Sequence, residues 1–473
     1  MPPTPHFRPE TIHAALGEAF FDVVAAAPFP QSILRYRNRR WDGRVGLDGL
    51  TDAEWTAHFG RFEPLPGSFP QPLALRYHGH QFRSYNPDLG DGRGFLFAQL
   101  RDEQGRLLDL GTKGSGQTPW SRRGDGRLTL KGGVREVLAT EMLEALGVET
   151  SKSFSLIETG EALHRHDEPS PTRASVLVRL SHSHIRIGSF QRLLAHNDAA
   201  GVERLLRHCV AHYRPEAARE TLPEMAAAFL GVVAARTART CARWFAAGFV
   251  HGVLNTDNIN ITGESFDYGP YRFLPYYDPG FTAAYFDETG LYAFDRQPDT
   301  IAWNLARLAE CLTLVAPLDL LEPELQRYGE LFWAELRSAI CRRLGVIRQD
   351  DEADDALIRL LFGFLRESKA PFEAVMFDLH GGPARLEKAI SGPRADLYAR
   401  ADFAPLREAL QARTVSLDAN LGHPYFEGEE PVTLVYDEIE ALWEPIATRD
   451  DWALFERKIA DIARVREAYG FAS

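Results

Sequence analysis

The sequence is poor in several features that would point to particular classes of protein. Its 473 residues include only four cysteines, which lie far apart and mostly in helical patterns. This excludes a disulfide-stapled secreted fold and favours buried, reduced thiols in a cytoplasmic protein. No run approaches the roughly 20 apolar residues of a membrane span, and the first residues show no basic segment followed by a long apolar stretch. We therefore expect no membrane contact and no secretory signal.

Positive charge and several familiar binding motifs are also scarce. The 53 basic and 66 acidic side chains give a net charge of −13, which argues against nucleic acid as a partner. The sequence has no Walker motif, and Gly90-x-Gly92-x-Gly94 is not the dinucleotide fingerprint. His182 and His184 lack a companion cluster of cysteines or carboxylates, so we expect no zinc site. We also expect a monomer.

The hydrophobic content of 45% is that of an ordinary globular protein. The periodicity of the hydrophobic residues divides the chain into a strand-rich part and a helical part. Strand-like runs and one helix fall between residues 75 and 182, and helical periodicity dominates from about 189 onward. We predict an α+β, two-lobed protein-kinase-like fold with a small β-rich N-lobe and a large helical C-lobe. Residues 1–74 would wrap the first lobe, 75–182 would form the N-lobe, and 183–473 would form the C-lobe with a C-terminal extension. The cleft between the lobes is the expected site.

The stretch from Leu107 to Leu146 reads as a strand, a cationic glycine-rich loop and an amphipathic helix. With the run before it, this strand forms a predicted β-hairpin around Asp102–Gly105. Eleven glycines fall between residues 90 and 133, several times the average density of the chain. Glycine lets backbone N–H groups approach a phosphate closely, but tight turns in a small sheet would also explain the excess.

Lys113 ends the predicted strand, and Glu136 follows 23 residues later in the first turn of the helix. A strand lysine held by a helix glutamate is the arrangement with which kinase-like folds position nucleotide phosphates. A surface ion pair, or no pair, is the alternative. The motifs downstream favour the kinase-like interpretation.

Those motifs run from His251 to Asn258 and continue with Asp267-Tyr268-Gly269. They fit the frame of a kinase catalytic loop and its DFG segment, in which the asparagine and the second aspartate bind Mg²⁺. The position of the catalytic aspartate holds Val253, which can neither accept a proton nor bind a metal. Either the protein is catalytically silent, or Asp257 takes over as the acceptor.

Two arginines stand where the lobes would join. Arg179 ends a predicted strand and Arg186 follows it. Guanidinium groups suit terminal phosphate oxygens, although solvent exposure is the alternative. Asp125-Gly126, inside the glycine-rich loop, is either a simple turn or a nucleotide contact.

Six motifs between residues 73 and 285 are similar to those of the selenoprotein O family: YHGHQF, GDGRG, KGSGQTPWSRRGDGR, VREVLATEM, HGVLNTDN and FDYGPY. The resemblance implies a protein-kinase-like fold that acts as a protein adenylyltransferase. Such enzymes bind ATP in an inverted orientation, with Mg²⁺ or Mn²⁺, and move AMP to Ser, Thr or Tyr hydroxyls of target proteins.

The resemblance also implies roles for individual residues. Lys113 and Glu136 would form the nucleotide-positioning ion pair, and Asp257 would accept the proton. Asn258 and Asp267 would hold the metal. The expected nucleotide contacts are Gly90, Gly92, Arg93, Lys113, Asp125, Gly126, Arg179, Arg186 and Asp267.

One feature of some relatives is missing here. They carry a regulatory cysteine pair that links the segment after the DYG motif to the C-terminus. The corresponding stretches, PYYDPGFTAAYFD and AYGFAS, contain no cysteine, so we do not expect redox regulation of this kind. A kinase-type phosphotransferase using Asp257 and a silent nucleotide-binding scaffold remain the alternative functions.

Overall fold

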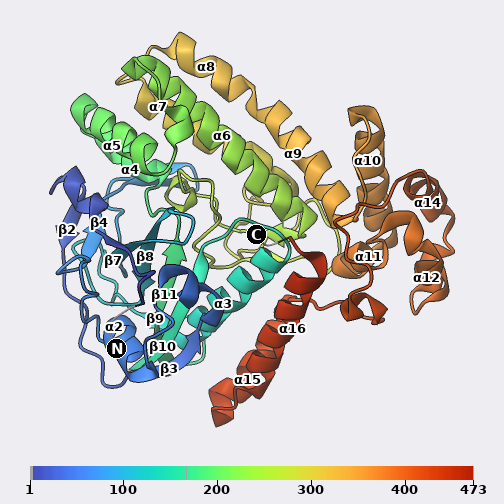
Figure 1. The fold of residues 1–473 in the computed structure, drawn as a ribbon, viewed down its shortest axis with the longest axis horizontal. Helices are drawn as coiled ribbons and strands as arrows, with labels where there is room; N and C mark the ends of the chain where they lie inside the picture. Colours follow the sequence, from blue (N-terminus) through green and yellow to red (C-terminus); the bar gives the residue numbers. More distant parts are fainter. Residues whose placement is uncertain (1–3, 167, 472–473) are drawn as a thin grey trace.

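The computed structural model describes residues 4–166 and 168–471. An antiparallel β-sheet occupies the N-terminal part, and most of the chain after residue 186 is helical (Figure 1). This confirms the mixed α+β prediction. The ends of the predicted N-terminal segment and C-terminal extension, including the last two residues of the AYGFAS tail, lie outside the described residues. In the described ranges, none of the helices has both the length and the apolar composition that a bilayer crossing requires.

The main sheet has nine strands, and all of its pairs are antiparallel. The order along the sheet is β2-β4-β7-β8-β11-β10-β3, with β1 paired to β7 and β9 to β11. The strands are β1 (Pro9–Glu10), β2 (Phe21–Val23), β3 (Ile33–Arg37), β4 (Leu73–Leu75), β7 (Leu96–Arg101), β8 (Leu107–Lys113), β9 (Leu128–Thr129), β10 (Lys152–Leu163) and β11 (Thr172–Ser181).

The predicted hairpin is present as the β7–β8 pair. The Asp102 carboxylate accepts hydrogen bonds from the backbone N–H groups of Gln104 and Arg106, at 3.0 and 2.9 Å. Gly105 has φ +81°, a left-handed conformation that glycine adopts without a Cβ clash. The turn therefore fixes the register that brings Lys113 to the end of β8.

Helix α3 (Leu130–Ala145) lies against the sheet, mainly on β10 and β11. It begins at Leu130, because Thr129 acts as the N-cap and its hydroxyl accepts from the Gly132 N–H at 3.1 Å. Glu136 therefore lies in the second turn of the helix, and the prediction that it lies in the first turn was wrong. Thirteen of its sixteen residues are buried, including Glu136 and Glu141. Because a buried carboxylate is costly unless it is paired, both glutamates need hydrogen-bond or ion-pair partners.

The first 74 residues supply β1, β2 and β3 to the sheet. They also supply α2 (Asp52–Gly60), which packs beside β10 and β3. Trp55 and Phe59 of α2 stack on Phe154 of β10, with ring centroids 4.9 and 5.6 Å away. A second, smaller hydrophobic core forms there, separate from the main core around α3 and the helical part.

The helical part surrounds the long helix α6, which contacts α7, α8 and α9 (Figure 1). In chain order the remaining helices are α1 (Arg39–Asp42), α4 (Ile187–Ala195), α5 (Ala199–His212), α6 (Leu222–Ala246), α7 (Gln297–Leu312), α8 (Leu318–Gln326), α9 (Tyr328–Arg343), α10 (Asp351–Ser368), α11 (Phe372–Asp378), α12 (Leu386–Ser391), α13 (Ala395–Tyr398), α14 (Ala404–Gln411), α15 (Tyr436–Arg449) and α16 (Ala453–Tyr469).

Two short hairpin-like sheets position the loops that carry the remaining motifs. Strands β12 (Phe249–Val250) and β13 (Arg272–Phe273) pair and close the loop that contains His251 to Tyr271. Strands β5 (Gly79–Gln81) and β6 (Ser84–Asn86) form the other sheet, which touches that loop. The His80 N–H donates to the Thr256 hydroxyl at 2.7 Å. Residues separated by about 180 positions thus meet at one place.

Candidate functional site

A cavity of about 720 Å³ lies between the main sheet and the loop that β12 and β13 close. Its walls come from the 89–94 and 120–127 loops, the ends of β8 and β11, and the segment from 257 to 267. Ten of the twelve predicted site residues line it: Gly90, Gly92, Arg93, Lys113, Asp125, Gly126, Arg179, Arg186, Asp257 and Asp267. Glu136 and Asn258 lie outside its lining.

Glu136 stands behind Lys113 rather than in the cavity. The Lys113 ammonium forms an ion pair with Glu136, and both side chains are buried. The same ammonium lies 2.8 Å from Asp267 Oδ1. Glu136 Oε2 is buried without a hydrogen-bond partner in the described chain. The predicted pair is therefore formed in the structure, and it holds the ammonium at the cavity wall.

Asp267 forms ion pairs with two cations of the cavity wall, Lys113 and Arg179. Its Oδ1 also lies 3.2 Å from Arg179 Nη1. Burial alone would raise the pKa of this carboxyl, but Lys113, Arg179 and Arg186 outweigh it and hold the pKa well below its usual value. The Asp267 backbone has φ +65°, a strained conformation for a residue other than glycine. His251 Nε2 donates to the neighbouring Phe266 carbonyl at 3.0 Å, which supports this conformation.

Asp257 is a buried carboxylate with an unused oxygen. Its residue exposure is 8%, and Oδ1 has no hydrogen-bond partner among the described residues. Loss of hydration raises its pKa to about 6, although the nearby Arg186 opposes the rise. A carboxylate with this pKa is ionised at neutral pH and can still take up a proton.

Asn258 follows Asp257 in the short 3-10 helix Thr256–Asn258. Its side-chain amide donates to the Val253 carbonyl at 2.9 Å. Within the described residues its amide oxygen accepts no hydrogen bond, so this oxygen could still act as a metal ligand. Val253, which occupies the position of the kinase aspartate, thus contributes only its backbone to the loop.

Asp267 has the chemistry of a ligand for a small, hard cation. It lines the cavity with one oxygen that accepts no hydrogen bond from the described residues, and Mg²⁺ is commonly held by one or two such protein oxygens together with phosphate and water. Asn258 also has an amide oxygen that is free within the described chain, but it lies outside the cavity lining. In the described part of the chain, no group of three or more His, Cys, Asp and Glu residues could hold a metal ion. A metal at this site would therefore depend on the substrate for part of its coordination.

Arg186 links several residues of the cavity wall through hydrogen bonds. It is buried, and Nη1 donates to the Tyr77 hydroxyl and the Asp257 carbonyl, both at 3.1 Å. Nη2 lies 3.3 Å from Asp91 Oδ1, and the other oxygen of Asp91 accepts from the Leu75 N–H at 3.0 Å. Sequence reasoning missed Asp91 and Tyr77. Asp91 stands between two predicted glycines, but no sequence signal links it to Arg186, which lies 95 positions away in the chain.

The predicted glycines allow the two loops to pack together. A Cβ at Gly90 would lie 2.4 Å from Cγ of Trp120, and one at Gly92 would lie 2.7 Å from the Trp120 carbonyl oxygen. Gly126 has φ +70°, and a Cβ there would lie 2.2 Å from the Gly116 backbone. Close packing of the loops thus accounts for these three glycines without any ligand.

Arginines crowd the outer rim of the cavity. Arg93, Arg122 and Arg123 are exposed and form no ion pair with other described residues, so they remain available to an anion. Asp125 differs, because Arg165 binds its carboxylate at 2.8 Å and the Arg127 N–H at 2.9 Å. These bonds lower its pKa despite partial burial. Arg122 and Arg123 were not among the predicted contacts, although only Gly124 separates them from Asp125.

Comparisons with known proteins identify the family of the chain. The family model described as "Protein adenylyltransferase SelO" matches residues 6–463. The proteins named "Protein nucleotidyltransferase YdiU" from a Synechocystis strain and from Gloeobacter violaceus are 45% and 44% identical to this chain. These alignments cover 93% and 98% of this chain and 94% and 96% of the two relatives. A Vibrio cholerae protein of the same name is 37% identical over 77% of this chain and 73% of its own length. The chain belongs to the SelO protein adenylyltransferase family.

Proposed function

We propose that this protein transfers AMP from ATP to hydroxyl side chains of proteins, Ser, Thr or Tyr, and releases pyrophosphate. Membership of the SelO family over nearly the whole chain supports the reaction class. The observation that carries the proposal is the single cavity in which Lys113, Arg179 and Asp267 meet a buried carboxylate with a free oxygen, Asp257.

We further propose that the fold is a two-lobed, protein-kinase-like one. The main sheet and α3, with the Lys113–Glu136 pair, would form the small lobe, and the helices from α4 onward would form the large one. Its parts would be residues 1–74, 75–182 and 183–473. The order of Lys113, Glu136, the 251–258 loop and Asp267 along the chain supports this assignment.

Binding of ATP would rest on positive charge and positioning. Arg179 and Arg186 would bind the terminal phosphates, and Lys113, fixed by Glu136, would bind an inner phosphate oxygen. Gly90, Gly92, Arg93, Asp125 and Gly126 would shape and line the nucleotide site. Asp267 and Asn258 would hold Mg²⁺ or Mn²⁺, which supplies neutralisation of the phosphate charge when bound. Since the transition state disperses charge over phosphate oxygens, these groups would contribute most of the rate enhancement.

Asp257 would complete the chemistry. Its carboxylate would take the proton of the substrate hydroxyl as the hydroxyl oxygen attacks the α-phosphorus of ATP. A bond forms between that oxygen and the α-phosphorus. The bond from the α-phosphorus to the oxygen bridging to the β-phosphorus breaks, and pyrophosphate leaves with both electrons of that bond. Val253 takes no part in this step.

The test is transfer of label from ATP that is radioactive at either the α- or the γ-phosphate. Label from the α position alone is expected on the protein acceptor. Label from the γ position alone would overturn AMP transfer in favour of a kinase reaction. No label from either position, with ATP still bound, would leave a silent nucleotide-binding scaffold. The variant Asp267→Ala, checked for folding by circular dichroism, should lose all transfer.

We also propose that the enzyme works as a monomer in the cytoplasm. The four cysteines are free and buried, and burial raises the pKa of each thiol, as expected for a reducing compartment. Thiol titration of denatured protein should find four free thiols per chain, and sedimentation should give the mass of one chain.

A further inference from the structure

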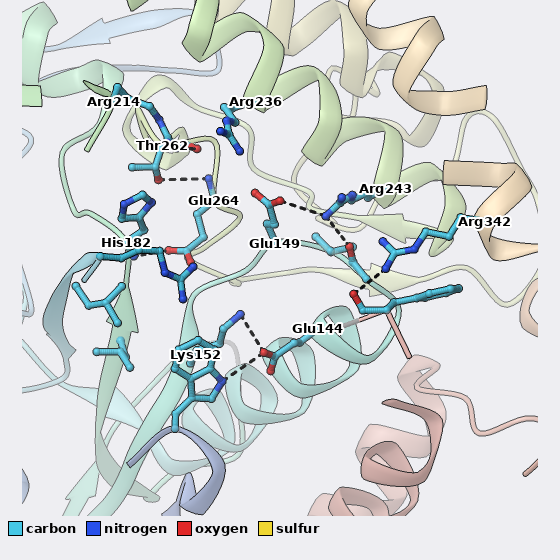
Figure 2. Close-up of a pocket in the computed structure, with 17 residues that line it drawn as sticks. Glu144, Glu149, Lys152, His182, Arg214, Arg236, Arg243, Thr262, Glu264 and Arg342 are labelled. Carbon is cyan, nitrogen blue, oxygen red and sulfur yellow. Dashed lines mark hydrogen bonds and ion pairs between the residues drawn. The ribbon is translucent and has the colours of Figure 1, made fainter. Parts of the chain in front are cut away.

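A second cavity, of about 440 Å³, lies at the other end of α3 from Glu136. Glu144 near the end of α3, Lys152 at the start of β10 and His182 after β11 form one side of it (Figure 2). Arg236 and Arg243 of α6 and Arg342 of α9 form the opposite side, and Glu149 and Glu264 lie between the two sides (Figure 2). Lys113, Asp257 and Asp267 are not among its lining residues, so the two cavities are separate.

Cations outnumber carboxylates in the lining of this second cavity. The six cations are Arg106, Lys152, Arg214, Arg236, Arg243 and Arg342, against three carboxylates, Glu144, Glu149 and Glu264. The lining thus has three excess positive charges in a protein whose net charge is −13. Such a concentration inside an acidic protein is costly unless something neutralises it.

The carboxylates are already engaged. Glu144 is paired with Arg40, which lies outside the lining, and with Lys152 at 3.3 Å. Glu149 lies 3.4 Å from Arg243. Glu264 accepts the His182 N–H at 2.8 Å. Two of the cations pair with carboxylates outside the lining, Arg106 with Asp102 at 2.7 Å and Arg236 with Glu216 at 3.4 Å. Arg214 and Arg342 are the lining cations left without a close carboxylate among the described residues.

Two of the arginines donate hydrogen bonds only to neutral groups. Arg214 is buried and donates to the carbonyls of Thr262 and Tyr213, and its Nε has no partner within the described chain. Its nearest carboxylate, Glu216, is 4.0 Å away. Arg342 donates to the Phe471 carbonyl at 2.8 Å. Carbonyl oxygens satisfy hydrogen bonds but do not neutralise a charge.

The arginines also repel one another. Burial and the neighbouring Arg236 lower the pKa of Arg214 to about 10. Burial lowers the pKa of Arg342 as well, and Arg243 lowers it further. A bound anion would reverse both effects, because it would replace repulsion between cations with attraction.

We propose that this second cavity binds a compact anion that carries phosphate groups and at least two negative charges. Guanidinium forks match phosphate oxygens with paired hydrogen bonds, and the volume is within the range of small-ligand sites. The ring of Phe471, 4.5 Å from the Arg342 guanidinium, forms a wall of the cavity. This site is independent of the proposed transfer reaction.

The test is calorimetric titration of the full chain with inorganic pyrophosphate in EDTA. Because the nucleotide cavity also attracts phosphate, wild type should bind two equivalents. The double variant Arg122→Gln/Arg123→Gln should weaken only the nucleotide cavity, and Arg236→Gln/Arg342→Gln only the second cavity. Each lost charge-assisted contact should weaken binding about tenfold, so the second pair should cost about 100-fold at one site. Arg327→Gln/Arg464→Gln removes the same charge from exposed positions and should leave both sites intact.

Two results would overturn the proposal. One is wild-type binding at both sites in the Arg236→Gln/Arg342→Gln variant. The other is loss of all pyrophosphate binding in the Arg122→Gln/Arg123→Gln variant. Citrate, a tricarboxylate, should bind at least tenfold more weakly than pyrophosphate at the second site, and equal binding would refute the phosphate assignment.

A measurement on unmodified protein removes any dependence on how the variants fold. Phenylglyoxal modifies accessible arginines, and mass spectrometry locates the products. With the nucleotide cavity filled by a non-hydrolysable ATP analogue, added pyrophosphate should protect Arg236 and Arg342 from modification and leave Arg327 unprotected. Equal modification of Arg236 and Arg342 with and without pyrophosphate would contradict the proposal.

Discussion

Two aspartates in this protein, the half-buried Asp267 and the buried Asp354, are each paired with two cationic side chains, yet their surroundings differ. Asp354, in α10, is fully buried and accepts hydrogen bonds with both oxygens. Its Oδ1 is bound by Arg413 and by the Gln349 N–H at 3.2 Å, and Oδ2 by Arg348 at 2.9 Å. Asp267 uses Oδ1 for both of its cations, and its Oδ2 accepts no hydrogen bond from the described residues.

The difference teaches how to separate a structural ion cluster from a functional one. Cations lower the pKa of both carboxyls despite their burial, so the pKa does not distinguish them. Asp354 lies in a regular helix, and both of its carboxylate oxygens already accept hydrogen bonds from the protein. Asp267 has a left-handed backbone, a free oxygen and a place in a cavity wall. Unused binding capacity, rather than burial or charge, marks the candidate site.

The largest expected effect is on catalysis at Asp267. Asp267→Asn should lower AMP transfer about 10³-fold, because it removes a charged ligand for the metal and a partner of Lys113. The variant should also unfold at a lower urea concentration than wild type, because Lys113 keeps Glu136 as a partner but the buried Arg179 loses its carboxylate. Labelled α-phosphate transfer and urea unfolding measure the two quantities. Transfer above a tenth of the wild-type rate would show that Asp267 is not a functional residue.

Asp354→Asn should affect stability and spare catalysis. It leaves Arg413 buried without its carboxylate and should lower the free energy of unfolding by about 3–5 kcal/mol. At temperatures where the variant stays folded, AMP transfer should remain within about twofold of wild type, since mutations far from a site mostly change stability. Urea unfolding and labelled transfer again provide the measurements. A large loss of transfer in folded protein would mean that the two clusters are coupled.

A third aspartate, Asp257, extends the comparison to pH. Its pKa is raised to about 6, so the fraction able to accept a proton falls as pH drops below that value. The kcat/KM for transfer should therefore fall about tenfold per pH unit below pH 6. Asp257→Asn should lower the rate about 10²-fold and flatten the profile between pH 5 and pH 7. A wild-type rate that does not change across this range would exclude Asp257 as the acceptor.

The smallest expected effect concerns the loop that shapes the nucleotide cavity. Gly90→Ala places a Cβ 2.4 Å from Cγ of Trp120 and must displace that ring. Because overpacking typically costs 1–3 kcal/mol, the KM for ATP should rise about tenfold with little change in kcat. Gly363→Ala in α10, the helix of Asp354, is the matched control, since its Cβ would meet nothing within 4 Å. Steady-state kinetics on both variants would test the claim, and an unchanged KM in Gly90→Ala would contradict it.

Local patterns in the sequence predicted the elements that carry Lys113 and Glu136. The turn at Asp102–Gly105 and the apolar spacing of α3 depend only on neighbouring residues, so a hairpin and a helix could be expected there. Strands β1 and β2 have two and three residues, too few for any periodicity. Their pairing with β7 and β4 is set by distant parts of the chain.

In the candidate site, too, some features could be predicted from the sequence, and others depend on distant parts of the chain. Motif order along the chain pointed to Asp257, Asn258 and Asp267. The free oxygen of Asp257 and the contact of Asp91 with Arg186 depend on how four separate segments meet, which no local pattern reports. The glycines at 90 and 92 were expected near phosphate, and the structure adds their contact with Trp120.

Glu141 lies on the same helix as Glu136. Its carboxylate accepts hydrogen bonds from the Tyr36 hydroxyl at 2.9 Å and the Asn38 side-chain amide at 3.0 Å, and it forms an ion pair with Arg466. These partners come from segments far apart in the sequence, and α16 packs along α3. The helix that carries Glu136 is therefore held from two sides by distant parts of the chain. Removal of α16 should loosen the helix that positions Lys113, although no residue of α16 lines the nucleotide cavity.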